Sequence, residues 1–315
     1  MVDEVIVPGS VANLGGGFDT LAVAVELYLR ARIIDVRADG GARLEIVRSR
    51  PQVKGSNAVE RAFAAIARQA SRPVPTVFAE IDSDIPLAAG LGSSAAACVA
   101  GLRIFERVTA PVPEATLLSI ATALEGHADN AAATLFGGMT SVIDDEDGSG
   151  SDSRRRVQAL RWEWPDDLRL IVATPFTGLP TSKARAALSP QISRQDAVFN
   201  LQRVLSLVHA LQRREYDRLR EALRDRWHQP ARAVLVPHLT AVLEIDDPDV
   251  LGACLSGAGP SVAVFARRDF GRVERLLQAT CEAAGTPVTV RILAAHRLEG
   301  QEAWEVSPSR PWRTA

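Results

Sequence analysis

Residues 86–97 read P-L-A-A-G-L-G-S-S-A-A-A, and this run of small residues governs how the rest of the chain is interpreted. Gly90 and Gly92 carry no Cβ atom, so the backbone can take unusual dihedral angles and approach a ligand closely. Ser93 and Ser94 follow at the expected start of a helix, where serine is a good cap. The sequence after them is apolar and prone to form a helix. The run therefore predicts a glycine-rich turn that leads into a buried helix.

Such a turn suits a phosphate group. The first turn of a helix leaves amide N–H groups without partners at the positive end of the helix dipole, and both features attract anions. The run lacks the Gly-Lys-Ser/Thr sequence of the Walker A motif, so phosphate would be bound by backbone amides and hydroxyls without a loop lysine. A tight turn before a core helix is the alternative. We prefer the phosphate site, because two glycines, two serines and three alanines follow in order.

The composition indicates a globular protein without a nucleic-acid or membrane partner. The chain has 315 residues, enough for two medium domains, and 47% of them are hydrophobic. Its formal net charge of −2 argues against nucleic acid. The three cysteines form no spaced cluster, which favours a reducing cytoplasm over a structural zinc site. The first residues lack the basic and long apolar segments of a signal peptide or membrane span.

The first half of the chain mixes strands, turns and helices. Strand-like and helical patterns alternate, with strands expected at 4–8, 28–36 and 77–81 and helices at 57–69 and 114–125. The apolar residues 21–27 are assigned to a helix or a buried connection, and D-G-G at 39–41 to a hairpin turn. Hairpins mixed with helices favour an α+β fold over a doubly wound sheet.

The second half is expected to open with an apolar strand at 168–174. Its other patterns predict helices at 197–211 (capped by Asp196), 216–223 and 272–284, and strands within 251–266 and 287–294. Residues 144–156 predict an exposed loop, and we expect little order after residue 300 beyond docking of Trp304 or Trp312. The expected division is a domain at 1–163, a second domain at 164–302 and a tail at 303–315.

Two further segments carry polar side chains. Residues 9–21, G-S-V-A-N-L-G-G-G-F-D-T-L, predict a flexible loop with Asn13 and Asp19 near its ends, or else a plain turn. Residues 125–130, E-G-H-A-D-N, precede small apolar residues. They either face a cleft or form a solvated turn after a helix that ends at Gly126, and the residues alone favour neither interpretation.

Three separated segments, 9–21, 86–97 and 251–266, together resemble the three motifs of the GHMP kinases. The central motif of that family, P-x-x-x-G-L-G-S-S-A, is intact here. The opening V-P-G-S-V-A-N-L-G-G-G-F-D, the run E-G-H-A-D-N-A-A-A-T and the stretches T-S-K-A-R-A-A-L and H-Q-P-A-R-A-V-L-V-P are similar to the homoserine kinase branch. The resemblance covers nearly the whole chain, from about residue 5 to about residue 294.

The resemblance implies a two-domain α+β fold, with an N-terminal domain like ribosomal protein S5 domain 2 and a ferredoxin-like C-terminal domain. It implies ATP-dependent phosphorylation of the side-chain hydroxyl of L-homoserine in threonine biosynthesis, with Mg²⁺, in the cytoplasm. A homodimer is left open. Two alternatives also stay open: a kinase for another small alcohol, such as threonine or an isoprenoid precursor, and a non-catalytic small-molecule sensor on this fold.

The resemblance also implies which residues would hold ATP and its metal. Ser94 and Glu125 match the positions that supply oxygen ligands to Mg²⁺, which prefers such ligands. Asn57 would reach the adenine. The complete set expected along the nucleotide is Asn57, Pro86, Leu87, Ala88, Ala89, Gly90, Leu91, Gly92, Ser93, Ser94, Ala95 and Ala96.

The substrate of such an enzyme is a zwitterion with a primary alcohol. Arg185 and Arg232 match the two substrate-like stretches, and guanidinium groups suit its carboxylate. Asp19 with Asn13 would bind the ammonium group. The residues expected to line the same pocket are His127, Asp129 and Asn130.

The proton acceptor is the least determined part of this mechanism. Asn130 matches the segment in which mevalonate kinase-type members place an aspartate, and an amide does not accept a proton at neutral pH. The alcohol would then attack without a protein base, and Asp129 as the base is the competing hypothesis. Four departures from the family pattern leave room for a shifted substrate preference, at Gly9, Val11, Gly16 and Ala128.

Overall fold

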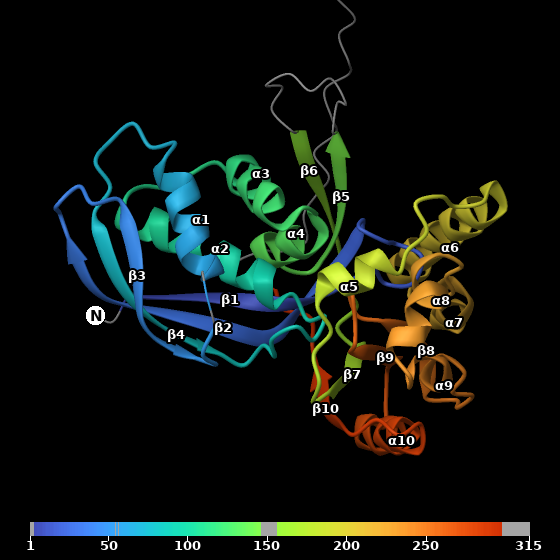
Figure 1. Ribbon diagram of the computed structural model, residues 1–315. Helices are drawn as coiled ribbons and strands as arrows, with labels where there is room; N and C mark the ends of the chain where they lie inside the picture. The colour runs from blue at the N-terminus through green and yellow to red at the C-terminus, as the bar shows by residue number, and fades with distance from the viewer. Residues whose placement is uncertain (1–2, 54, 56, 146–155, 298–315) are drawn as a thin grey trace, which may run out of the picture.

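The structure is a computed structural model that describes residues 3–53, 55, 57–145 and 156–297. Within these residues the strands form two sheets, one from each half of the chain (Figure 1). Most of the loop expected at 144–156 and the whole tail 303–315, with Trp304 and Trp312, lie outside the described residues. No helix in the described ranges is both long and apolar enough to cross a membrane.

The first sheet is built around one long strand, β2 (Leu21–Arg37). This strand pairs antiparallel with β1 (Asp3–Ala12), β4 (Thr76–Ser83) and β5 (Met139–Asp145). Two further strands, β3 (Arg43–Arg50) and β6 (Arg156–Trp162), extend the sheet at its sides. The resulting order is β3-β4-β2-β5-β6, with β1 also on β2 and with β3 parallel to β4.

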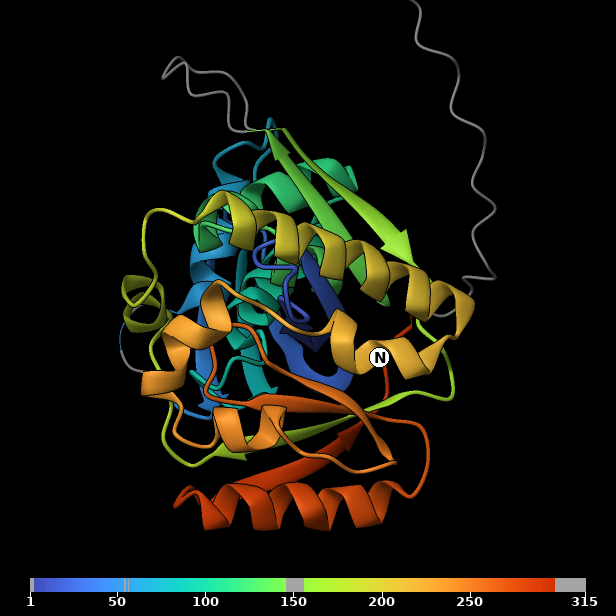
Figure 2. The same ribbon diagram turned by 90° about the vertical axis from the view of Figure 1, so that its right-hand side faces the viewer.

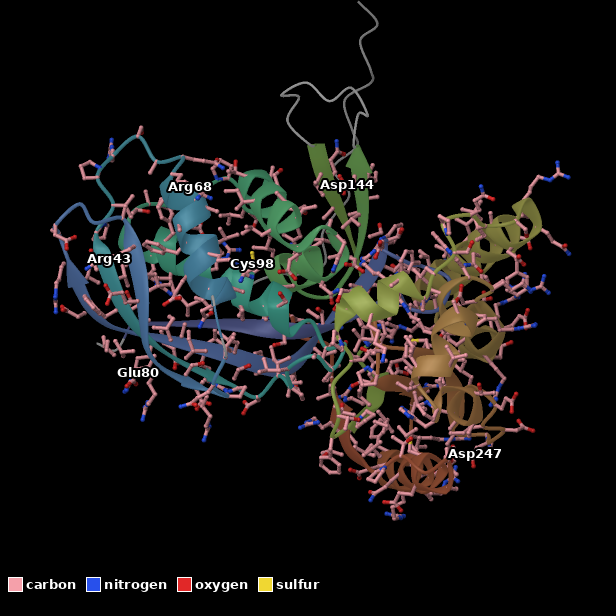
Figure 3. All side chains as sticks on the ribbon, in the orientation of Figure 1. Arg43, Arg68, Glu80, Cys98, Asp144 and Asp247 are labelled. Atoms are coloured by element: carbon pink, nitrogen blue, oxygen red, sulfur yellow. The ribbon has the colours of Figure 1, made fainter. Side chains whose placement is uncertain are left out.

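Four helices cover one face of this sheet, namely α1 (Ala58–Ala67), α2 (Ser93–Val108), α3 (Glu114–Glu125) and α4 (Asp129–Phe136) (Figure 1). The apolar run after the glycine turn becomes α2, which is buried along most of its length. On the other face of the sheet, Glu80 accepts hydrogen bonds from Arg32 and Arg48 (Figure 3). The core between sheet and helices therefore holds the N-terminal end of α2 in place.

The second sheet has the order β10-β7-β9-β8 and is antiparallel throughout. Its strands are β7 (Arg169–Pro175), β8 (Val250–Leu255), β9 (Val262–Ala266) and β10 (Val288–Leu293). The helices that accompany it are α5 (Thr181–Ala186), α6 (Arg194–Arg213), α7 (Leu219–Ala222), α8 (His228–Arg232), α9 (Leu239–Leu243) and α10 (Phe270–Ala283). Figure 2 shows α6 and α10 on opposite sides of the strands.

The two halves meet where the three glycine-rich segments come together. The amide of Gly257 donates to the carbonyl of Ala12 at 3.0 Å, and the Asn13 side-chain amide donates to the carbonyl of Gly257 at 2.7 Å. The Ser256 hydroxyl donates to the carbonyl of Gly90 at 2.7 Å. Gly90 has φ +75° and lies so close to this turn that a Cβ atom there would overlap the Ser256 carbonyl oxygen. Segments that are far apart in sequence thus fix one another.

The strands and helices expected in the first half are confirmed, but three other assignments there differ from the structure. Residues 21–27 belong to β2 and are neither a helix nor a connection. Residues 21–25 are buried on both faces of the sheet, so the alternation that marks a strand is missing. The loop expected at 9–21 is also shorter, because its first four residues belong to β1.

The hairpin expected at 39–41 is wrong. The chain turns there, but β4 lies between β2 and β3, and β3 pairs with β4 alone. D-G-G favours a reversal of the chain, but it carries no information about a strand that arrives 30 or so residues later.

Two expected helix caps are displaced by one or a few residues. Gly92, in a left-handed conformation with φ +70°, precedes α2, and Ser93 and Ser94 are its first helical residues. Ser193 caps α6 through a 3.0 Å hydrogen bond from the Asp196 amide to its hydroxyl, so Asp196 is inside the helix. The helix at 197–211 is otherwise confirmed.

Candidate active site

A cavity of about 360 Å³ lies where the glycine-rich segments meet. Most residues expected at the site line it, namely Asn13, Asp19, Asn57, Leu87, Ala88, Ala89, Gly90, Gly92, Ser93, Ser94, Ala95, Glu125, His127, Asp129, Asn130, Arg185 and Arg232. Pro86, Leu91 and Ala96 do not line it. Leu91 and Ala96 are instead buried in the protein core, where they support the turn from behind.

The glycine turn brings the first residues of α2 to the wall of this cavity. The first intrahelical hydrogen bond of α2 runs from the amide of Ala96 to the carbonyl of Gly92 at 2.8 Å. The amides of the three residues before it, Ser93, Ser94 and Ala95, therefore have no carbonyl partner within the helix. A Cβ atom on Gly92 would overlap the Ser10 hydroxyl and lie 3.1 Å from Oδ1 of Asn130. Glycine is required here by space as well as by its φ angle.

Two oxygen-bearing side chains stand next to these amides. The Ser94 hydroxyl donates to Oε1 of Glu125 at 2.7 Å. Glu125 ends α3, because Gly126 follows in a left-handed conformation with φ +83°. The helix end at Gly126 and the cleft expected for residues 125–130 are thus both present. The hydroxyl and the carboxylate are hard oxygen donors held close together, which fits a Mg²⁺ ligand pair.

Asn57 lines the same cavity from the position just before α1. Its Oδ1 accepts a hydrogen bond from the amide of Val59 at 3.0 Å and so caps the helix. The side chain therefore has a structural role whether or not its amide group reaches a nucleotide.

At the other end of the cavity, Asp19 and Arg185 form a two-pronged ion pair with N–O distances of 2.8 and 2.9 Å. Asn13 orients the aspartate, since its Oδ1 accepts from the amide of Asp19 at 3.0 Å. The hydrogen bonds that Arg185 donates to Asp19 raise the pKa of Arg185. Both partners are about one-third exposed at 33% and 37%, so a ligand in the cavity can reach them.

Arg232 is the second guanidinium group and is only 1% exposed. Its Nε donates to the carbonyl of Ala184 at 3.3 Å and its Nη1 to the carbonyl of Gly257 at 3.1 Å. Burial and the nearby charge of Arg185 lower the pKa of Arg232 to about 10. It is still cationic at neutral pH, and it has no carboxylate within salt-bridge distance among the described residues. A buried cation without an anion favours an anionic ligand.

His127, Asp129 and Asn130 form a cluster at the start of α4. Oδ1 of Asp129 accepts from Nδ1 of His127 at 2.7 Å, from the amide of Asn130 at 2.8 Å and from its Nδ2 at 3.3 Å. Burial lowers the pKa of His127, but the hydrogen bond and the charge of Asp129 outweigh it, so that the net change is a raised pKa. One ligand atom of each of Asp19, His127 and Asp129 lies within 4.8 Å of the others, and this arrangement also suits an ammonium group.

Sequence reasoning missed several residues of the site. The Ser10 hydroxyl is fully buried and donates to Oδ1 of Asn130 at 2.8 Å, which fixes the orientation of that amide. Its position in the opening V-P-G-S-V-A-N is a signal that could have identified it. Other residues line the cavity without having been expected there, namely Val53, Ala58, Arg61, Ala97, Thr181, Gly257 and Ala258.

Comparison with known proteins places this site in a family. The GHMP kinases N terminal domain model matches residues 57–138, and the GHMP kinases C terminal model matches residues 207–284. The homoserine kinase of Solibacter usitatus is 37% identical over 278 residues, which cover 86% of this chain and 88% of that protein. The homoserine kinase of Deinococcus radiodurans is 40% identical over 260 residues, with 82% of both chains covered.

Comparison with solved structures gives the same family as the sequence comparisons. The crystal structure of homoserine kinase from Cytophaga hutchinsonii superposes with a TM-score of 0.80 at 25% identity and covers 94% of this chain and 96% of its own. Galactokinase from Lactococcus lactis, at 14% identity and a TM-score of 0.66, shares the fold alone. The two-domain α+β fold expected from the sequence is confirmed, and the chain belongs to the GHMP kinases, within their homoserine kinase family.

Proposed function

We propose that the protein transfers the γ-phosphoryl group of ATP to the side-chain hydroxyl of L-homoserine and releases O-phospho-L-homoserine and ADP, as a step of threonine biosynthesis. The relatives from Solibacter usitatus and Deinococcus radiodurans are homoserine kinases. The observation that carries the proposal is the cavity itself, which has the first residues of α2, with amides that lack a partner within the helix, at one end and charges of both signs at the other. A zwitterionic alcohol placed between them would have its hydroxyl near the phosphate chain.

The amides at the start of α2 are proposed to bind the phosphates of ATP. Three consecutive amides and the positive end of a 16-residue helix favour an anion there. The turn brings no side chain larger than a leucine to this place, and the backbone can follow the phosphate chain closely. Phosphoryl transfer needs positioning and charge stabilisation above all, which such a cradle provides.

Ser94 and Glu125 are proposed to hold Mg²⁺. Their mutual hydrogen bond at 2.7 Å shows that both oxygens reach one point beside the amides. When bound, Mg²⁺ neutralises charge on the phosphates. The hydroxyl proton of Ser94 would then turn away from Glu125, which leaves both oxygens free to act as ligands.

The substrate is proposed to separate the Asp19–Arg185 ion pair and to form a new ion pair with each of these two side chains. The carboxylate of homoserine would take Arg185 together with Arg232, and its ammonium group would take Asp19. Because each released charge finds a new opposite charge, a zwitterion can divide the pair without leaving either half unpaired. A plain hydroxy acid offers only the carboxylate half of this exchange and a neutral alcohol offers neither half, which supports an amino acid as the substrate.

The phosphoryl step is proposed to proceed without a protein base. The hydroxyl oxygen bonds to the γ-phosphorus as the bond from that phosphorus to the bridging oxygen of ADP breaks, and the proton leaves late, to a phosphate oxygen. A loose transition state tolerates a weakly activated nucleophile. Asn130 is proposed to orient the hydroxyl. Three donors already occupy Oδ1 of Asp129, so a base at this residue would have to use Oδ2.

The function is tested by ADP formation with homoserine, threonine and mevalonate as acceptors, with the phosphorylated product identified by phosphorus NMR. We expect the highest kcat/KM with homoserine and a phosphomonoester on its side chain. A parallel Mg²⁺ titration of Glu125→Gln should show a higher metal requirement than the wild type. ADP formation that is no faster with homoserine than with another acceptor, or ATP binding without turnover, would overturn the proposal.

The domain division and the location are proposed with it. The last residue of β6 is Trp162 and the first of β7 is Arg169, which supports a boundary near residue 163 and domains at 1–163 and 164–302. We propose a cytoplasmic protein, because ATP is available there and because Cys98, Cys254 and Cys281 are free thiols.

A further inference from the structure

His228 does not line the cavity, but it connects two parts that do. It is the first residue of α8, and its side chain is completely buried. Its Nε2 lies 2.7 Å from the carbonyl oxygen of Gly15, and its Nδ1 lies 3.3 Å from Nη1 of Arg232. One end of the ring thus contacts the loop between Asn13 and Asp19, and the other contacts a guanidinium group of the cavity.

The partners determine where the ring carries its proton. A carbonyl oxygen can only accept, so Nε2 must bear the hydrogen that is donated to Gly15. A guanidinium group can only donate, so Nδ1 must offer a lone pair to Arg232. Both bonds are satisfied by one state alone, the neutral imidazole with its proton on Nε2.

The surroundings keep the ring in that neutral state. Burial lowers the pKa of His228, and the charge of Arg232 lowers it further, against the opposing effect of Asp225 and the carbonyl of Gly15. Asp225 lies 3.6 Å from Nε2, but its oxygens are occupied by the amides of Trp227 and Gln229 at 2.9 and 2.6 Å. A second proton on the ring would also face Arg232 with a like charge.

The contact completes a set of restraints on Arg232. Its Nε and Nη1 are held by Ala184, Gly257 and His228, from three separate segments. Its Nη2 makes no hydrogen bond within the described residues. The loop on the other side of the ring is equally constrained, since Gly15 has φ +72° and a Cβ there would lie 2.8 Å from Cα of Leu223.

We propose that His228 is a positioning residue for substrate binding: it fixes the distance between Arg232 and the loop that carries Asp19. This inference rests on the proposed function, because Arg232 and Asp19 are the groups assigned to the two charges of homoserine. His228 itself touches no substrate. Its effect should therefore appear in the KM for homoserine and not in the KM for ATP, which is bound at the other end of the cavity.

Two conservative variants separate the ends of the ring. The side-chain nitrogen of Gln in His228→Gln can replace Nε2 as donor to Gly15, but this side chain leaves Arg232 without its acceptor. The side-chain oxygen of Asn in His228→Asn can replace Nδ1 as acceptor for Arg232, but this side chain does not reach Gly15. His238→Asn is the matched control, because His238 is also fully buried, contacts the carbonyl of Pro260 at 3.1 Å and does not line the cavity.

Steady-state kinetics are measured with each substrate varied in turn, together with the melting temperature of every variant. Both His228 variants should raise the KM for homoserine about tenfold, the loss expected for one hydrogen bond to a charged group, with the KM for ATP unchanged. His238→Asn should lower the melting temperature without changing the ratio of the two KM values. Equal changes in both KM values, or a loss of kcat alone that follows the melting temperature, would overturn the proposal.

The tautomer gives a second readout that does not depend on the substrate. Nitrogen-15 NMR of the wild type, with His228 assigned by the resonance missing in His228→Asn, should show a protonated Nε2 and an unprotonated Nδ1. A protonated Nδ1 would overturn the proposal even if homoserine is the substrate. If homoserine is not phosphorylated but the Nε2 tautomer is present, the proposed function fails and the geometry of His228 stands.

Discussion

Asp19 and Arg185 illustrate how the polar side chains of the cavity are paired with one another. The two side chains form hydrogen bonds with each other. Three other pairs do the same at the site, and all these hydrogen bonds are 2.7 to 2.9 Å long: Ser94 with Glu125, His127 with Asp129, and Ser10 with Asn130. Buried polar groups need such partners. Binding therefore exchanges one partner for another, and the specificity of the site depends on which ligand replaces both halves of a pair.

Replacing Asp129 tests whether the reaction uses a protein base. We expect Asp129→Asn to lower kcat by less than about a hundredfold, because an amide oxygen can still accept from His127 while the alcohol reacts without a base. The measurement is single-turnover phosphoryl transfer at saturating ATP and homoserine. A loss of several orders of magnitude would identify Asp129 as the base and exclude the base-free scheme.

The His127–Asp129 pair should also make stability depend on pH. The pKa of His127 is raised above its ordinary 6.5 in the folded protein, so the charged pair stabilises the fold fully below that pH. The stabilisation is lost as the pH rises through the raised value. We therefore expect His127→Gln to reduce the free energy of unfolding more at about pH 6 than at about pH 8.5. Denaturation by urea at both values tests this, and a larger effect at high pH would contradict it.

At the scale of elements, α2 was the easiest part of the structure to predict and β2 the hardest. The turn at 86–97 carries its own chemistry, since glycine, serine and alanine are required locally. The strand at 21–37 is defined by three neighbours in the sheet, and its buried first half shows no period of two. Local sequence patterns therefore predict α2 and its phosphate-binding role. They do not predict the pairing of distant strands, such as β3 with β4.

The start of α2 depends on the absence of a side chain at Gly92. In Gly92→Ala the left-handed φ would destabilise the fold by about 1 kcal/mol, and the added methyl group would also clash with Ser10 and Asn130. We expect kcat to fall by about 10²-fold, as for other small displacements of reacting groups.

Gly285→Ala is the control for Gly92→Ala. Gly285 has φ +75° and open space around its missing Cβ atom, so Gly285→Ala is destabilised only by the left-handed backbone conformation. We expect the melting temperature to fall for both variants and further for Gly92→Ala, whereas only Gly92→Ala should lose kcat. Equal activity of the two variants would show that the crowding at Gly92 has no bearing on catalysis.

Asn57 combines a helix cap with a place in the cavity, and substitution can separate the two roles. Asn57→Ala should cost about 1 kcal/mol of stability through loss of the cap on α1, and Asn57→Ser should restore it. If the amide also reaches the nucleotide, Asn57→Ser should keep a raised KM for ATP. Thermal unfolding and ATP kinetics of both variants check this. If both the KM for ATP and the melting temperature of Asn57→Ser return to the wild-type values, Asn57 acts only as a helix cap.

At the scale of the whole molecule, the active site exists only because the two sheets bring distant segments together. Asn13, Gly90 and Gly257 come from three parts of the chain, and hydrogen bonds join all three segments. The sequence showed which residue types would be used, since each motif is local. It did not show that Asp19 and Arg185 pair directly or that Ser10 orients Asn130, because such contacts follow from packing between distant elements.

The central claim is that a zwitterion divides the Asp19–Arg185 pair. It is tested most directly by kcat/KM for homoserine against 4-hydroxybutyrate, which lacks the ammonium group, and 3-aminopropan-1-ol, which lacks the carboxylate. We predict that each analogue loses at least about 10²-fold, because one charge of the pair would stay unpaired. Phosphorylation of either analogue within about tenfold of homoserine would contradict the account.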